Sequence, residues 1–229
     1  MCNNAIDIDF DAQAMKTRDR ILATALDLFN EQGEVHTTAL DLADELDMSP
    51  GNLYYHFKGK DPIIESLFER FEAQISETLA APIEAPLGAD DSIENNWYYL
   101  FVLLEDMHDY RFLYDNLTDL IHRYPNIERG FKRILKLKRA AFFALCNQLI
   151  PNSLPAREQQ LSAVADNLSQ TATFWFSFDQ LVHPRRSAEL TIHRGVLQLL
   201  TMIAPYLGDA QQAFYRDCEA VFESLQKQA

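Results

Sequence analysis

A short segment, residues 49–60, carries several side chains that can form hydrogen bonds: a serine, an asparagine, two tyrosines, a histidine and two lysines. The pair Ser49-Pro50 is typical of a helix start, and the free amides of a first helical turn can hold a phosphate. Leu53 and Phe57 lie four positions apart and therefore face inward together. The outward face then carries Gly51, Asn52 and Tyr55. The segment is therefore suited to binding a molecular surface that carries phosphate groups.

Sequence signatures of catalysis are missing from the chain. There is no G-x-S-x-G, no H-E-x-x-H and no phosphate-cradling glycine loop. The nearest arrangement is Glu105-Asp106-x-x-Asp109, which keeps one alternative open, an all-α enzyme with paired carboxylates. The histidines at 108, 122, 183 and 193 lack metal-ligand spacing, and the three cysteines are far apart. We therefore expect no catalytic residue, no metal and no cofactor.

The composition is that of a globular protein. Seven glycines and nine prolines stand against 15 phenylalanines and nine tyrosines, which excludes a disordered or collagen-like chain. The longest apolar run, Trp97–Leu104, has eight residues, whereas a membrane-spanning helix needs roughly 20. The N-terminus has neither a basic start nor an apolar stretch of signal-peptide length. We expect a cytoplasmic protein without a membrane partner.

The charge argues against binding a polyanion. The net charge is −14, and residues 1–60 carry five basic against eleven acidic side chains. An acidic chain repels phosphate unless its charge is unevenly arranged. Composition therefore leaves open a helical protein-interaction module with weakened nucleic-acid binding.

Helical periodicity runs along the whole chain, and no alternating strand pattern appears. The first helix begins at Thr17 and is closed by Gly33, the second opens at Thr38 with Asp41 three residues on, and the third spans 49–57. A loop is expected at Ala80–Asp91. The remaining helices are predicted at 62–79, 92–108, 110–122, 126–150, 156–182, 187–206 and 209–227. The fold class is therefore all-α.

The two short helices between Thr38 and Lys60 have the length and turn of a helix-turn-helix, whose second helix enters the major groove of DNA. The wider pattern resembles the TetR family of bacterial repressors. The resemblance rests on Thr17-Arg18-x-x-Ile21-Leu22-x-x-Ala25-x-x-Leu28-Phe29-x-x-x-Gly33, Thr37-Thr38, Leu42-Ala43 and Ser49-Pro50-Gly51-Asn52-Leu53-Tyr54-Tyr55-His56-Phe57-x-x-Lys60. Asp47 departs from it, since the family usually has glycine in this turn, but aspartate tolerates the left-handed conformation better than most residues.

The resemblance implies DNA-binding roles by position. Tyr54 and Lys60 match residues that hold phosphates, and Thr38 and Ser49 match helix-start contacts to the DNA backbone. The positions that reach into the groove are Gly51, Asn52, Tyr55 and His56. The implied protein is a homodimeric repressor that leaves a palindromic double-stranded operator when a small apolar or amphipathic effector binds.

We expect three parts: a flexible segment at 1–15, a helix-turn-helix DNA-binding domain at 16–61, and a ligand-binding and dimerisation domain at 62–229. Helix 62–79 joins the last two, and the helices at 156–182 and 187–206 are expected to form the dimer interface. Aromatic residues spread over four body helices suggest an apolar effector site. The candidate ligand-binding residues are Tyr98, Phe101, His108, Arg111, Phe143, Asn147 and Trp175.

Two body segments permit several interpretations. Six of the residues in Arg129–Arg139 are basic, which fits a solvated face paired with acids, a second DNA contact or an anionic-ligand site. Four bulky rings at 174, 175, 176 and 178 crowd one helix. They fit core packing, a ligand pocket or a subunit interface.

Overall fold

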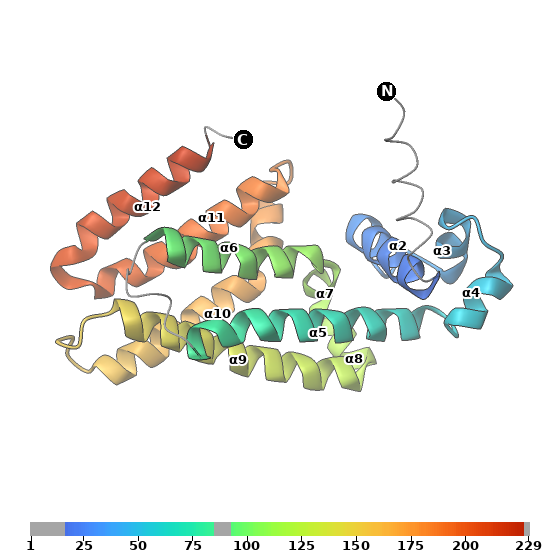
Figure 1. Ribbon diagram of the computed structural model, residues 1–229, viewed down its shortest axis with the longest axis horizontal. Coiled ribbons are helices and arrows are strands. Elements are labelled where there is room, and N and C mark those ends of the chain that lie inside the picture. The colour runs from blue at the N-terminus through green and yellow to red at the C-terminus, as the bar shows by residue number, and fades with distance from the viewer. Residues whose placement is uncertain (1–16, 85–92, 227–229) are drawn as a thin grey trace, which may run out of the picture. The chain divides into compact units, whose positions relative to one another are not determined.

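The computed structural model describes residues 17–84 and 93–226, so the expected flexible segment 1–15 lies outside the described residues. Within these ranges the regular elements are helices and no strand is present (Figure 1), which confirms the all-α fold class. The chain divides into two compact units, one up to Arg70 and one from Phe71 onward. No helix in these ranges is long and apolar enough to span a membrane.

The first unit is a small helical head built around one apolar core. Its elements are α2 (Thr17–Gln32), α3 (Ala39–Glu45), α4 (Pro50–His56) and the start of α5 (Lys60–Glu84). The core side chains come from all four helices and include Ile21, Leu22, Phe29, Leu42, Leu53, Phe57, Ile63 and Leu67. Gly33 ends α2 with φ +83°, and its amide donates to the Phe29 carbonyl at 3.0 Å. The predicted glycine cap is thus present.

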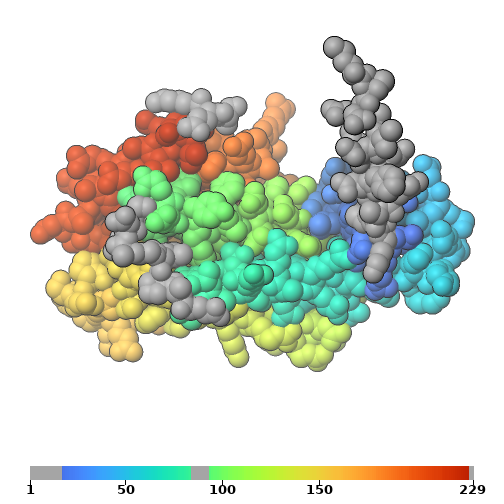
Figure 2. Space-filling model, in the orientation of Figure 1, coloured from blue at the N-terminus to red at the C-terminus, as the bar shows by residue number. Residues whose placement is uncertain are grey.

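The second unit is a larger helical body. Its elements are α6 (Ile93–Asp109), α7 (Phe112–Asp115), α8 (Leu117–Arg123), α9 (Pro125–Leu149), α10 (Arg157–Val182), α11 (Ala188–Ile203), the 3-10 turns Ala204–Tyr206 and Gly208–Ala210, and α12 (Gln211–Gln226). Helix α9 packs along α10, while α11 packs against α6, α10 and α12. Figure 2 shows the surface of α12 meeting that of α6, two segments far apart in the sequence.

Helix α5 is longer than the sequence predicts. It runs to Glu84 and contains Pro82, whereas the prediction ended it at residue 79 and placed a loop at Ala80–Asp91. Proline removes one helical hydrogen bond and clashes with the preceding turn. Here Ile75, Leu79 and Pro82 all lie buried, so apolar packing keeps the helix intact past the proline. The rest of the expected loop, 85–91, lies outside the described residues.

The single helix predicted at 110–122 is in fact two short ones, α7 and α8, separated at Asn116. The backbone of Asn116 leaves the helical region, with φ −127° and ψ 29°. Three consecutive residues before it, Phe112–Tyr114, are all buried, and three successive positions cannot share one face of a continuous helix. The break thus follows a run of buried residues, and it falls at a residue type that favours helix ends.

Gly195 lies where three body helices pack closely together. A Cβ at this position would lie 2.6 Å from Nε1 of Trp175 on α10 and 2.7 Å from Cδ1 of Leu104 on α6. The indole is itself fixed, because its Nε1 donates to the Thr191 carbonyl at 2.9 Å. A side chain at 195 would therefore overpack the junction of three helices.

We predict that Gly195→Ala lowers the free energy of unfolding by about 1–3 kcal/mol, the usual cost of overpacking a dense core. Urea denaturation measures it. The matched control is Gly51→Ala on α4, where an added Cβ meets only the Ser49 hydroxyl at 4.0 Å. That change should leave stability unchanged or raise it by up to about 1 kcal/mol through helix propensity. Equal effects of both substitutions would show that the α10–α11 crossing is not tightly packed.

Candidate functional site

Local hydrogen bonds hold α3 and α4 in the predicted helix-turn-helix. At the start of α3 the Thr38 hydroxyl accepts from the Asp41 amide, while the Asp41 carboxylate accepts from the Thr38 amide at 2.7 Å. Ser49 caps α4 by accepting from the Asn52 amide at 3.2 Å. The turn between them passes through Asp47 at φ +50°, the left-handed conformation expected there. The Met48 amide then donates to the Ala43 carbonyl at 2.9 Å and closes the turn.

The outward face of α4 displays the predicted DNA-binding side chains. Tyr55 is 78% exposed and Tyr54 is 48% exposed. His56 is half-buried, with its ring set edge-on to that of Tyr55 at a centroid distance of 5.2 Å. The smaller predicted residues Thr38, Ser49, Gly51 and Asn52 are also exposed. The predicted residues of α4 and of the start of α3 are thus largely open to solvent.

Lys60 is engaged within the head. Its Nζ donates to the Glu34 carbonyl at 2.5 Å and lies 3.5 Å from the Glu34 carboxylate, whose side chain is almost fully buried. The amine therefore ties the start of α5 to the segment that follows α2. Its phosphate-holding role stays a prediction, and it requires the amine to share its donors between Glu34 and DNA.

Three further residues of the head were given no role by sequence reasoning. The Arg18 guanidinium lies 4.1 Å from the centroid of the Phe57 ring and donates to the His56 carbonyl at 3.2 Å. It thereby connects α2 to the end of α4, and its place in the Thr17-Arg18 motif was the available signal. Val35 and Leu40 are 57% and 58% exposed.

The electrostatics of the head are uneven. Asp41, Asp44, Glu45 and Asp47 are all exposed on α3 and the turn. The backbone hydrogen bond from Thr38, and then its side-chain bond, lower the pKa of Asp41, so this carboxylate stays charged at neutral pH. Helix α4 carries no acid, and exposed Lys58 follows it directly. Polyanion binding must therefore concentrate on α4 and its flanking cations.

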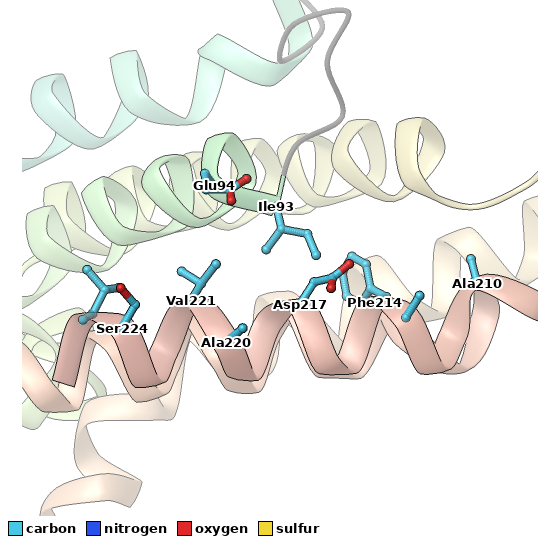
Figure 3. Close-up of a pocket in the computed structure, with 10 residues that line it drawn as sticks. Ile93, Glu94, Ala210, Phe214, Asp217, Ala220, Val221 and Ser224 are labelled. Atoms are coloured by element: carbon cyan, nitrogen blue, oxygen red, sulfur yellow. The ribbon is translucent and has the colours of Figure 1, made fainter. Parts of the chain in front are cut away.

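The body contains several surface pockets. The pocket drawn in Figure 3 has a volume of about 810 Å³ and lies between the start of α6 and one face of α12. Ile93 points toward the α12 helix there, where Asp217 and Val221 face it. A second pocket, about 590 Å³, lies between α5 and α6. A third, about 430 Å³, lies among α10, α11 and α12.

The predicted ligand-binding residues do not line one described cavity. Tyr98 borders the pocket between α5 and α6, whereas Trp175 borders the one among α10, α11 and α12. The Phe101 ring packs on His193 at 4.9 Å, and the Asn147 amide oxygen accepts from Arg157 at 2.8 Å. Phe143 is half-buried on α9. A shared ligand role for these residues stays a prediction.

His108 and Arg111, the other two candidates, lie near the end of α6. Burial lowers the pKa of the His108 imidazole, and the nearby Arg111 charge lowers it further. The His108 ring meets Phe176 edge-on at 5.4 Å, and Arg111 donates to the His108 carbonyl at 3.4 Å. Both groups already have partners within the body.

The basic stretch on α9 is mostly a solvated face with local partners. Lys132 pairs with Glu128 at 2.6 Å, Arg133 with Glu72 at 2.7 Å and Arg139 with Asp166 at 2.5 Å, all at the surface. Arg129 donates to the Asn126 side chain at 2.6 Å. This arrangement agrees with the interpretation of charges paired with nearby acids.

Lys138 is the exception on this helix, because it is fully buried. Its Nζ donates to the Thr173 hydroxyl at 3.0 Å, lies 3.7 Å from the Met107 sulfur and sits 5.4 Å from the centroid of the Tyr114 ring. Burial lowers the pKa of this amine to about 7. The signal for burial was present in the sequence, since residue 138 shares a helical face with buried Ile134 and Phe142.

Comparison with known proteins identifies the fold. A family model described as bacterial transcriptional repressor matches residues 70–215, and one described as bacterial regulatory proteins, tetR family, matches residues 21–67. The chain belongs to the TetR family. TetR regulators are transcription factors and not enzymes, as the sequence predicted for this chain.

Individual relatives agree with this assignment. The chain is 34% identical over 88 residues to the transcriptional repressor KstR2 of Mycolicibacterium smegmatis. This alignment covers 35% of the present chain and 42% of KstR2. It is 27% identical over 114 residues to the probable regulator YttP of Bacillus subtilis, covering 50% and 53%. The matches thus span about half the length of these curated relatives. A TetR-family regulator of Marinobacter aquaeolei superposes with a TM-score of 0.75 at 29% identity, covering 92% and 98%.

The buried amine predicts a pH-dependent stability. We expect Lys138→Met to raise the free energy of unfolding at neutral pH by roughly 1–4 kcal/mol, because it removes a buried charge that no acid pairs within the described residues. The folded lysine loses its proton near pH 7, whereas the unfolded one keeps it to about pH 10.5. Wild-type stability therefore rises through this window as the penalty disappears.

The advantage of Lys138→Met should accordingly shrink between about pH 7 and about pH 8.5. Unfolded cysteine begins to titrate near the top of this range, but its contribution is the same in both proteins and cancels in the difference. Urea denaturation of both proteins at the two pH values measures it. A stability difference that does not change with pH would show that Lys138 keeps an ordinary pKa.

Proposed function

We propose that this chain is a dimeric, sequence-specific DNA-binding regulator of the TetR family that acts as a repressor and leaves its operator when a small apolar or amphipathic molecule binds. The observation that carries the proposal is the capped α4 helix, whose polar and aromatic face is exposed in a helix-turn-helix. In such motifs the second helix lies in the major groove with its first residues at the base edges.

The positions on α4 suggest which residues contact bases and which contact phosphates. Asn52 and Tyr55 point outward from the helix and are proposed to read base edges, together with Gly51 and His56. The Ser49 cap lies at the positive end of α4, where a phosphate is favoured. Phosphate contacts are proposed for Thr38, Tyr54 and Lys60. Backbone contacts of this kind fix the position on the duplex, and the groove contacts supply the specificity.

Dimerisation is supported by an apolar stripe on α10. Phe174, Phe178 and Leu181 are 57%, 61% and 84% exposed and follow a helical repeat along one face. Such a stripe is costly in water and is covered when two copies pair. We propose that α10 and α11 pair with the same helices of a second copy. The two α4 helices would then meet a palindromic operator in successive major grooves, about 34 Å apart.

Effector control is proposed to act through α5. This helix contributes Ile63 and Leu67 to the core of the head and Ile75 and Leu79 to the body core. A ligand that favours one body conformation changes the population of heads spaced for DNA. The alternative function, a helical interaction module with weakened DNA binding, draws its support from the exposed acids on α3.

DNA selected from a random pool by the purified protein tests the function. We expect a palindrome whose half-sites lie one helical turn apart. Asn52→Ala should relax the preference at one or two base pairs per half-site, at a cost of about 1–3 kcal/mol, while Lys58→Ala should weaken binding to all sequences alike. Recovery of unenriched DNA would favour the interaction module instead.

A second experiment tests the dimer. The wild type should sediment as a dimer at micromolar concentration, and Leu181→Glu should shift it towards monomer, because two carboxylates would enter an apolar interface. Leu181 is 84% exposed, so the variant should still fold. Leu135→Glu, on the exposed side of α9, is the control and should remain dimeric. A monomeric wild type would exclude the proposed operator geometry.

A further inference from the structure

The pocket between α5 and α6 has the dimensions of a small-molecule site. Its volume of about 590 Å³ falls within the usual range of roughly 300–1,000 Å³ for ligand pockets. Ala81 and Val102 supply apolar wall, Tyr98 and Tyr99 supply aromatic wall, and Thr78 and Glu77 supply polar groups. The lining thus combines apolar surface with a few polar contacts.

Tyr99 lines this wall, and its hydroxyl is an unused hydrogen-bonding group buried behind the wall surface. The residue is only 6% exposed, and its hydroxyl has no hydrogen-bond partner. Burial raises the pKa of this phenol above its usual range, so the group keeps its proton and can donate. A buried polar group without a partner costs free energy, and a ligand acceptor that reaches the hydroxyl would remove that cost.

The charges around the pocket are negative. Glu77 lies exposed at its edge, and the lining contains no lysine, arginine or histidine. Behind Thr78 lies the buried carboxylate of Asp106, which accepts from the Thr78 hydroxyl at 2.6 Å and from the Gln74 amide at 2.5 Å. No described residue forms an ion pair with Asp106.

Two further acids of α6, Glu105 and Asp109, lie close enough to Asp106 to interact with it. Burial raises the pKa of the Glu105 carboxyl, and repulsion from Asp109 and Asp106 raises it further. Burial and the charge of Asp106 act on Asp109 in the same direction, while Arg111 opposes them. The buried cation Lys138 does not line the pocket. An anionic ligand would therefore meet repulsion here, and a cation would meet attraction.

We infer that this pocket binds a lipophilic organic cation that also carries a hydrogen-bond acceptor. Glu77 and the faces of Tyr98 and Tyr99 would hold the positive charge, since aromatic faces attract cations, and the Tyr99 hydroxyl would donate to the acceptor. The identification of this ligand as the effector rests on the proposed function. Binding itself can be measured without DNA.

Two probes of the same shape test the charge. Benzoylcholine carries a quaternary ammonium and an ester carbonyl, and 3,3-dimethylbutyl benzoate is its neutral carbon isostere. Titration calorimetry should show the cation binding roughly threefold to thirtyfold more tightly, from one cation–π contact and one exposed ion pair. Equal or tighter binding of the neutral ester, or no binding of either probe, overturns the inference.

Two variants separate the contributions. Glu77→Gln should weaken the cation about twofold to fivefold and leave the neutral ester unchanged. Tyr99→Phe should weaken both esters about twofold to tenfold, because both lose the same hydrogen bond, while the melting temperature stays the same or rises. Glu69→Gln, an exposed acid of α5 outside the pocket, is the control and should change nothing. An equal loss in Glu94→Gln would place the site in the pocket of Figure 3 and overturn the assignment.

The outcome for the pocket is independent of the outcome for the function. If benzoylcholine binds as expected but does not release selected DNA, the proposed effector control fails and the pocket chemistry stands. If DNA is bound specifically and neither probe binds, the pocket chemistry fails and the regulator stands.

Discussion

One continuous helix, α5, supplies core residues to both compact units of this protein. Its buried side chains recur every three or four residues, from Ile63 and Leu67 in the head to Phe71, Ile75 and Leu79 in the body. Neither core is complete without its half of the helix. The helix is continuous over 25 residues and is held by successive backbone hydrogen bonds. The buried Pro82 shows how strongly packing maintains the helix near its end.

The head achieves its geometry largely with short-range bonds. The Thr38–Asp41 capping box and the Ser49 cap each span three residues, and the left-handed Asp47 reverses the chain between them. A cap contributes typically about 1 kcal/mol, so short helices such as α3 and α4 depend on theirs together with the shared core. As a result, the outward face of α4 does not contribute to the core and remains open to a partner.

The body, by contrast, retains polar groups at places where apolar residues would pack at lower cost. Lys138 has one oxygen partner, and the hydroxyls of Tyr99 and Tyr114 have none. Unused buried donors are uncommon in native proteins, and each calls for an explanation. Tyr99 lines a pocket, and its hydroxyl is proposed to donate to a ligand there, whereas Tyr114 faces the buried amine of Lys138 through its ring. Such groups lower stability while marking where specific chemistry is available.

The sequence by itself determined the features that depend on neighbours a few residues apart. The helical class, the caps at Thr38 and Ser49, the glycine end of α2 and the turn at Asp47 all follow from local hydrogen bonds and backbone preferences. The features that depend on packing between distant helices were decided only by the tertiary structure. It engaged Lys60 with Glu34, buried Lys138, and broke the helix predicted at 110–122 at Asn116. Burial and partner choice depend on surfaces far apart in the chain, and a local pattern does not specify which surfaces meet.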